Sequence, residues 1–324
     1  MRRVLVIGGA NYDQTAVAPR LPGTGETVLA TDYRETPGGK AANLASAAAA
    51  WGAPVSFVGR IGQDGFGDAL LAAWEAAGVD TTHALRDAAG TGLGIVFMDP
   101  AGHYQTVVVP RANANLSPRD VQALPAALWD EVGALALALE SPLDATLAAA
   151  GAAAGRGLPL VLNAAPVEGM VPELWTLASH LVVNEHEAAA LSGRTVGDPA
   201  AAVEAATALL GRLDPARAVA VIVTLGAAGA VAAMPGRAPL HSPAPRVEAI
   251  DTLGAGDTFV GVLAAEVAAG HELAGAIGAA CAAGAAAVTV PGARGAIGPD
   301  HVRRLARAIT DTTAAAGRPE GVLA

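Results

Sequence analysis

The amino-acid sequence predicts an α/β protein whose parallel sheet is covered by helices on both faces. Short apolar runs alternate with longer alanine-rich stretches along most of the 324 residues. Continuous apolar strands that are separated by helices are typical of a sheet buried on both faces. Hydrophobic residues make up 52% of the chain and charged residues 15%, which excludes intrinsic disorder because burial offsets the entropy lost on folding.

The predicted elements follow one another in a regular order. Strands are expected in the apolar runs at residues 4–7, 55–58, 134–139, 158–162, 181–183 and 219–223. Helices are expected in the alanine-rich stretches between them, because alanine has the highest helix propensity. These stretches are residues 41–51, 66–77, 143–154 and 200–213. The 39 glycines and 21 prolines supply the turns.

Two regions break this alternation and predict a second, smaller β-element. Residues 26–34 alternate weakly in hydropathy between glycine-rich loops. Residues 91–98 and 104–109 flank a turn sequence, Asp99-Pro100-Ala101-Gly102, with no helix between them, which predicts a hairpin. We expect a small β-sheet lid built from about residues 10–40 and 90–115, within a single domain over residues 1–324.

Charge and apolar length limit the partners that we expect. The chain has 20 basic and 30 acidic residues, a net charge of −10, which argues against nucleic acid and anionic membranes. Residues 273–293 carry no charge, but they are rich in alanine and glycine and contain Pro291, so we expect a buried helix followed by a strand. Residues 4–7 are too short for the core of a signal peptide. We therefore expect a cytoplasmic protein.

The motif from Asp251 to Phe259 carries the clearest chemical signal. It reads Asp-Thr-Leu-Gly-Ala-Gly-Asp-Thr-Phe, follows the apolar run 247–250 and opens a helix that continues to about residue 269. Glycines at a helix start let backbone N–H groups face an anion, which the helix dipole also favours. Asp257 adds a negative charge there. It is interpreted either as a base for an attacking hydroxyl during phosphoryl transfer or as a simple N-cap.

A second glycine-rich turn enters a helix at Gly38-Gly39-Lys40-Ala41-Ala42-Asn43. The glycines allow close backbone approach to a ligand, and Asn43 can face it one turn into the helix. An ordinary loop and helix start is the alternative interpretation. No G-x-x-x-x-G-K-[ST] phosphate loop occurs in the chain.

Further polar residues follow predicted strands. Asn11 and Asp13 follow the first strand, Glu140 follows residues 134–139, and Asn184 with Glu187 follows residues 181–183. Ligands of open α/β sheets bind beyond the carboxyl ends of the strands, so these side chains are expected to meet in one crevice. Taken singly, each is as well explained as a turn or capping residue.

Together these motifs resemble the ribokinase (PfkB) family of carbohydrate kinases, over about residues 4–309. The two signature regions of that family are matched by Gly38 to Asn43 with Val58 to Gly67, and by Asp251 to Phe259. The resemblance implies a ribokinase-like three-layer α/β/α sandwich with a small β-sheet lid. It also implies transfer of the γ-phosphate of ATP to a primary hydroxyl of a small sugar.

Roles for single residues are implied by the same resemblance. Asp257 would be the general base, and Gly254, Ala255 and Gly256 would form the anion hole for the transferring phosphoryl group. Sugar contacts are implied for Asn11, Asp13, Gly39, Lys40, Asn43, Glu140 and Asp257. A nucleotide and Mg²⁺ environment is implied for Asn184, Glu187, Thr224, Leu225, Gly226, Gly229, Gly256 and Cys281.

Cofactors and partners are likewise implied by the resemblance. ATP would act with Mg²⁺, and K⁺ would activate the enzyme at a site formed mostly by backbone carbonyls. The residues matching that monovalent-cation site are Asp251, Leu253, Ala287, Val290, Gly292 and Ala296. A homodimer formed through the exposed strands of the lid is expected.

The substrate implied first is D-ribose, converted to D-ribose 5-phosphate. Segments such as Asn11-Tyr12-Asp13 resemble the ribose-specific members, whereas Ala41 and Arg111 stand where glycine is usual in them. Fructokinase, 2-keto-3-deoxygluconate kinase and nucleoside kinase activities are the alternatives within the family. The 3% aromatic content disfavours a nucleoside, which would need a slot for its base. A non-catalytic sugar-binding regulatory protein on the same fold is the alternative from another class.

Overall fold

Strand side chains that alternate between two apolar clusters build the centre of the molecule. The computed structural model describes residues 1–100, 103–290 and 300. In the first strand, Val4 and Val6 pack into one buried cluster, and Leu5 and Ile7 pack into the other. Because alternate side chains of a strand point to opposite faces, the sheet is buried on both sides, as its continuous apolar runs predict.

The central sheet has the strand order β14-β13-β12-β11-β10-β9-β1-β4-β5, with β6 also paired to β4. Its parallel strands are β1 (Arg3–Ile7), β4 (Val55–Gly62), β5 (Val79–Asp80), β6 (Ala84–Asp87), β9 (Val132–Ala138), β10 (Leu160–Asn163), β11 (His180–Asn184) and β12 (Ala220–Thr224). Two antiparallel strands, β13 (Ala230–Ala233) and β14 (Leu240–Ser242), complete one edge. All six strands predicted from the sequence are confirmed.

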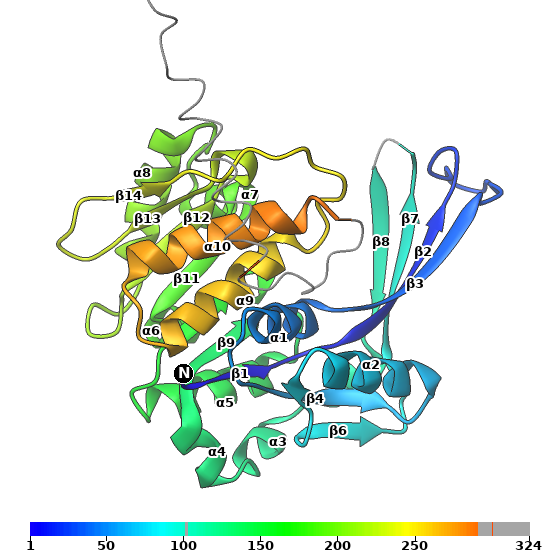
Figure 1. Ribbon diagram of the computed structural model, residues 1–324, viewed down its shortest axis with the longest axis horizontal. Helices are drawn as coiled ribbons and strands as arrows, with labels where there is room; N and C mark the ends of the chain where they lie inside the picture. Colours follow the sequence, from blue (N-terminus) through cyan, green and yellow to red (C-terminus); the bar gives the residue numbers. More distant parts are fainter. Residues whose placement is uncertain (101–102, 291–299, 301–324) are drawn as a thin grey trace, which may run out of the picture.

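Helices cover both faces of this sheet and make the predicted three layers (Figure 1). One face carries α1 (Lys40–Ala50), α2 (Gly65–Ala76), α9 (Ala255–Ala268) and α10 (Leu273–Ala287). The other face carries α3 (Pro118–Gln122), α4 (Ala126–Glu131), α5 (Leu143–Ala154), α6 (Pro172–Leu177), α7 (Glu185–Ser192) and α8 (Pro199–Leu210). Short 3₁₀ turns are η1 (Arg111–Asn115), η2 (Val167–Gly169) and η3 (Gly226–Ala228).

A small separate sheet stands beside the helical layer of α1, α9 and α10 (Figure 1). Its strand order is β3-β2-β7-β8, formed by β2 (Asn11–Val17), β3 (Asp32–Gly38), β7 (Gly92–Met98) and β8 (Tyr104–Val109). The predicted hairpin is confirmed as the antiparallel pair β7 and β8. The prediction for residues 26–34 is only partly right, since the strand begins at Asp32.

The apolar run that precedes the Asp251 motif forms a loop, in which the Ile250 and Asp251 N–H groups donate to the carbonyl of Val288. One local prediction was wrong. The helix expected from residue 273 ends at Ala287, and residues 288–290 form a turn in place of a strand. Residues 291–293 lie outside the described residues. No helix in the described ranges has the length and apolar character that crossing a bilayer requires.

Candidate active site

The two glycine-rich motifs open two helices that pack against each other. Gly39 is the N-cap of α1 and Gly254 is the N-cap of α9, with φ of 90° and 77°. Positive φ is strained for residues with a Cβ, so these turns require glycine. A Cβ at Gly39 would also lie 2.8 Å from the backbone nitrogen of Asn11. Both glycines therefore fix where the helices begin.

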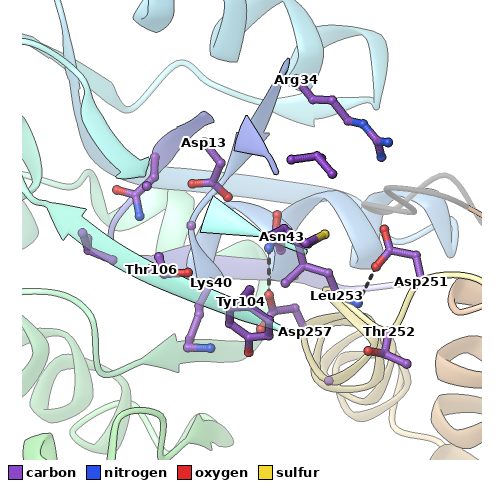
Figure 2. Close-up of a pocket in the computed structure, with 18 of the residues that line it drawn as sticks. Asp13, Arg34, Lys40, Asn43, Tyr104, Thr106, Asp251, Thr252, Leu253 and Asp257 are labelled. Carbon is purple, nitrogen blue, oxygen red and sulfur yellow. Dashed lines mark hydrogen bonds between the residues drawn. The ribbon is translucent and has the colours of Figure 1, made fainter. Parts of the chain in front are cut away.

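The catalytic candidates of the two motifs meet between these helix starts. Asn43 donates from Nδ2 to Oδ2 of Asp257 over 2.7 Å (Figure 2). Asp257 lies in the first turn of α9 and is 9% exposed, whereas the N-cap is Gly254. The interpretation of Asp257 as a simple N-cap is therefore wrong. Its carboxylate lies at the positive end of the dipole of α9, in the first turn, and meets Asn43 from the first turn of α1.

Three carboxylates set the charge state of Lys40 at the start of α1. Burial lowers the pKa of its ammonium, but the carboxylates of Asp257, Glu140 and Glu187 outweigh burial and hold that pKa above its ordinary value. Burial in turn raises the pKa of Glu140 and of Glu187, against the opposing charge of Lys40. The backbone N–H of Lys40 donates to Oε2 of Glu140 over 3.1 Å. Lys40 is therefore a fixed positive charge beside the carboxylate of Asp257.

The small sheet supplies the other predicted sugar contacts. Asn11 and Asp13 follow the first central strand, as the sequence predicts, and lie two residues apart on one face of β2. Gly94 on the neighbouring strand leaves room for Asp13, because a Cβ there would lie 2.2 Å from its Oδ1. The site is therefore shared by the small sheet and the two helices.

These groups line one open cleft of about 860 Å³. Figure 2 shows Asp13 and Arg34 on one side, Asp251, Thr252 and Leu253 on the other, and the Asn43–Asp257 pair between them. Of the predicted residues, the cleft is lined by Asn11, Asp13, Gly39, Lys40, Asn43, Asp251, Leu253, Gly254, Gly256 and Asp257. Glu140 joins them through its bond to Lys40.

Asn184 and Glu187 form a reciprocal cap at the start of α7. The backbone N–H of Asn184 donates to Oε2 of Glu187 over 2.8 Å, and the backbone N–H of Glu187 donates to Oδ1 of Asn184 over 2.9 Å. The capping interpretation of these two residues is thus confirmed. It does not remove them from the site, because the charge of Glu187 also acts on Lys40.

The residues matched to the nucleotide loop lie at the end of β12, next to Asn184. Thr224 pairs in register with Asn184, and the tight turn after it is closed by a 2.7 Å bond from Leu225 N–H to the carbonyl of Gly229. Cys281 donates from its thiol to the carbonyl of Ser242 over 3.6 Å, and burial raises the pKa of the thiol to about 11. We therefore expect this thiol to be unreactive, as its alanine-rich surroundings also predict.

The described members of the predicted cation site come from two neighbouring segments. The bonds from residues 250 and 251 to the carbonyl of Val288 bring Asp251 and Leu253 beside the end of α10, where Ala287 and Val290 lie. Gly292 and Ala296 lie outside the described residues. Within the described ranges no group of three or more His, Cys, Asp or Glu side chains could hold a metal ion.

Sequence reasoning missed several residues of the cleft. Tyr104, Thr106 and Arg34 reach it from the small sheet, where only the register of β8 and β3 could have placed them. Asn113 lies beneath it in η1 and donates to Asn11 over 2.8 Å. No sequence pattern indicated a role for Asn113, because its contact with Asn11 joins residues 102 positions apart.

The family model described as "pfkB family carbohydrate kinase" matches residues 1–298. A ribokinase from Mus musculus is 35% identical over 265 residues, covering 81% of this chain and 80% of the relative. One from Haemophilus influenzae is 35% identical over 263 residues, covering 81% and 84%.

Solved structures agree with these sequence matches. The crystal structure of a ribokinase from Thermotoga maritima has a TM-score of 0.83 at 28% identity, covering 95% of this chain and 100% of that chain. The structure of an Arabidopsis thaliana ribokinase complexed with ribose and ATP has a TM-score of 0.83 at 27% identity, covering 94% and 98%.

Proposed function

Because the chain belongs to the pfkB family of carbohydrate kinases, and is thus a phosphotransferase acting on a sugar hydroxyl, we propose that its reaction converts D-ribose and ATP to D-ribose 5-phosphate and ADP. The family membership confirms the resemblance drawn from the two glycine-rich motifs. The finer steps below, namely the base, the sugar and the ions, are our proposals.

The observation that carries the mechanism is the Asn43–Asp257 pair at the start of α9. We assign Asp257 as the general base. The oxygen of the primary hydroxyl attacks the γ-phosphorus while its proton passes to the Asp257 carboxylate. The bond from the γ-phosphorus to the bridging oxygen breaks, and ADP leaves with that electron pair. Asn43 orients the carboxylate throughout.

The surrounding groups stabilise the negative charge that the transfer carries. The N-terminal turn at Gly254, Ala255 and Gly256 presents backbone N–H groups and the positive end of α9 to the phosphoryl group. Lys40 adds a full positive charge that acts on the Asp257 carboxylate, since its raised pKa keeps the ammonium group protonated. Glu140 fixes the backbone of Lys40.

The residues at the start of α7 fit a Mg²⁺–nucleotide environment. Magnesium prefers oxygen ligands and usually keeps several waters, so one or two carboxylates suffice beside the phosphates. Glu187 offers such a carboxylate, held at one oxygen by the N–H of Asn184. When bound, Mg²⁺ would neutralise charge on the triphosphate. We place the adenosine end near Thr224, Leu225, Gly226, Gly229 and Cys281.

The choice of ribose is supported by the relatives and by the polarity of the cleft. Ribokinases from mouse, Haemophilus influenzae, Staphylococcus aureus and Bacillus subtilis are 33–35% identical to this chain. Asn11, Asp13 and Lys40 offer donors and acceptors that suit adjacent sugar hydroxyls. A deoxyribokinase from Salmonella typhi is 30% identical over 264 residues, so 2-deoxyribose is the competitor that a test must include.

Potassium activation is proposed at the loop that ends at Leu253. Asp251 there accepts at Oδ1 from the N–H of Leu253 over 2.9 Å, and the loop is bonded to Val288 at the end of α10. A monovalent cation held by carbonyls of these segments would fix the turn that begins α9. The expected effect of K⁺ is therefore on the placement of Asp257.

The small sheet is proposed as a lid and as a dimer interface. Its edge strand β8 carries exposed apolar side chains, with Tyr104 and Val107 58% exposed and Val108 49% exposed. An unpaired edge of this kind can pair with a second copy. Mass measurement in solution should give twice the 31.8 kDa of one chain, and a protein that is monomeric at all concentrations would contradict this proposal.

The reaction is tested by ADP release from MgATP across D-ribose, 2-deoxyribose, fructose, 2-keto-3-deoxygluconate and nucleosides, with and without K⁺. Selective turnover of ribose is expected, with a higher rate in K⁺. Turnover of another member would retain the mechanism and replace the substrate. No turnover, together with sugar binding in calorimetry, would favour a non-catalytic sugar-binding protein.

A further inference from the structure

Beneath the sugar side of the cleft, a buried asparagine that no motif singled out contacts Asn11. Asn113 is 4% exposed and Asn11 is 5% exposed. Asn113 comes from η1, which follows β8, whereas Asn11 begins β2. Their contact therefore joins the start of β2 to the segment that leaves β8, at one end of the small sheet.

The backbone of Ala10 dictates how the amide of Asn113 is oriented. The N–H of Ala10 donates to Oδ1 of Asn113 over 2.9 Å, and Nδ2 of Asn113 donates to the carbonyl of Ala10 over 3.0 Å. A backbone N–H can only donate and a carbonyl can only accept, so the opposite orientation of Asn113 would face like against like twice. Its amide has one allowed orientation.

That orientation fixes the amide of Asn11 in turn. The second hydrogen of Asn113 Nδ2 points to Asn11 over 2.8 Å, so the atom of Asn11 that meets it must be the acceptor Oδ1. Within the described ranges, Nδ2 of Asn11 donates to no protein group, and Asn11 lines the cleft. The cleft thus receives a donor from Asn11.

Two glycines leave just enough space for the amides of Asn113 and Asn11. A Cβ at Gly92 would lie 2.2 Å from Nδ2 of Asn113 and 2.5 Å from Oδ1 of Asn11, so that strand needs glycine beside the pair. A Cβ at Gly9 would lie 3.3 Å from Cγ of Asn113. The amide pair fills the space that these glycines leave.

We propose that Asn113 is a positioning residue that makes Asn11 a hydrogen-bond donor toward the sugar. Asp13, two residues along the same face of β2, offers its carboxylate oxygens as acceptors in the same cleft. One hydroxyl can accept from Nδ2 of Asn11 and donate to a carboxylate oxygen of Asp13, whereas a sugar that lacks this hydroxyl makes neither bond. The pair selects for a hydroxyl at one carbon of the sugar. This inference rests on the proposed sugar kinase function.

The test compares Asn113→Asp, Asn11→Asp and the double variant with the wild type, on D-ribose and on its 2-deoxy and 3-deoxy analogues. Asn113→Asp replaces the donor with an acceptor, so Asn11 must turn its Nδ2 inward and offer its oxygen to the cleft. Asn11→Asp keeps the bond from Asn113 and changes only the group that faces the sugar. Both should raise KM for ribose about tenfold, the effect of one lost hydrogen bond, with kcat within about threefold.

The preference for ribose over its deoxy analogues distinguishes a positioning role of Asn113 from a general structural role. The wild type should prefer ribose over one of the two deoxy analogues, and that preference should fall to the same low value in both single variants and in the double variant. A structural lesion would lower turnover of all sugars equally and leave the preference intact, which would overturn the proposal. Asn115→Asp is the matched control, because Asn115 lies in the same turn but bonds to Asp87 at the exposed surface. It should leave KM and the preference unchanged.

A titration of the wild type covers the case in which the Asn113 variants fail to fold. In a ¹⁵N side-chain amide spectrum, the Nδ2 signals of Asn11 are assigned by their loss in Asn11→Asp. Saturating ribose should shift these signals, and an unchanged pair of signals would contradict the proposal. If the wild type turns over another sugar of the panel, the proposed substrate is wrong, and the same titration with that sugar still tests the role of Asn113.

Discussion

Replacing Gly261 with alanine should disable the site from one helical turn away. Asp257 and Gly261 lie on one face of α9, and Asn43 and Ala47 lie on one face of α1, since residues four apart share a face. A Cβ at Gly261 would lie 2.6 Å from the carbonyl oxygen of Leu44 and 2.8 Å from Cβ of Ala47. The added methyl group therefore presses on α1 directly below the Asn43–Asp257 bond.

The size of the effect follows from these distances. Ordinary contact with the new methyl group begins near 3.4 Å, so α1 must move away by about 0.6–0.8 Å. A shift of that size would stretch the 2.7 Å Asn43–Asp257 bond to the limit of hydrogen bonding. We expect kcat to fall about 10- to 100-fold, and the free energy of unfolding to fall by about 1–3 kcal/mol.

Steady-state turnover of ribose and chemical denaturation measure the two effects. Gly275→Ala is the matched control, because a Cβ there meets nothing within 4 Å on an exposed face of α10. It should keep full activity and should not lower stability. If Gly261→Ala unfolds more easily yet keeps the wild-type kcat, the helix contact stabilises the fold without positioning Asp257, and the reasoning is refuted.

Three further predictions concern groups outside the cleft. Arg111 has a φ of 45° and donates to the carbonyls of Ala89 and Thr91. Arg111→Ala should lower the free energy of unfolding by about 2 kcal/mol, and Arg111→Gly by about 1 kcal/mol less, because glycine adopts a positive φ without strain. Equal losses in chemical denaturation would show that the backbone is not strained at this residue. Burial raises the pKa of Cys281 to about 11, so at pH 8 it should react with a disulfide reagent at least about a hundredfold more slowly than in the unfolded chain, and equal rates would contradict its burial. Burial lowers the pKa of His180 from 6.5 to about 4, so between these two pH values the unfolded chain binds a proton that the folded chain does not. The free energy of unfolding should therefore fall as the pH drops from 6.5 to 4, by up to about 3 kcal/mol more than in His180→Gln. Parallel pH profiles of the two proteins would refute this.

The central sheet could be predicted from the sequence because its strands are apolar without interruption. Leu5 and Ile7 pack on one face of β1 while Val4 and Val6 pack on the other, so burial on both sides is visible in the composition itself. The strand β2 was missed for the opposite reason. Its residues from Tyr12 to Val17 are half-buried in a small sheet, and its polar residues Asn11 and Asp13 line the cleft, so no apolar period marks it.

The site could be predicted where a glycine turn and a polar side chain share one motif. Asp257 and Asn43 were both expected in a ligand site, and the structure adds that they bond to each other. Asn113 could not have been given a role, because its contact with Asn11 depends on the path of η1 after an unusual φ at Arg111. The proposed cation site has a side-chain signal only at Asp251, since the identity of a side chain does not indicate which backbone carbonyls bind an ion.

The central claim is that Asp257 takes the proton of a ribose hydroxyl during phosphoryl transfer from ATP. It is tested most directly by following ribose 5-phosphate formation by ³¹P NMR with the wild type and with Asp257→Asn, while calorimetry measures ribose binding to both. We expect product with the wild type and a kcat about 10²- to 10⁴-fold lower in the variant. Ribose binding should be retained, because Asn43 keeps an oxygen partner in Asp257→Asn. Product formed by Asp257→Asn at the wild-type rate would contradict it.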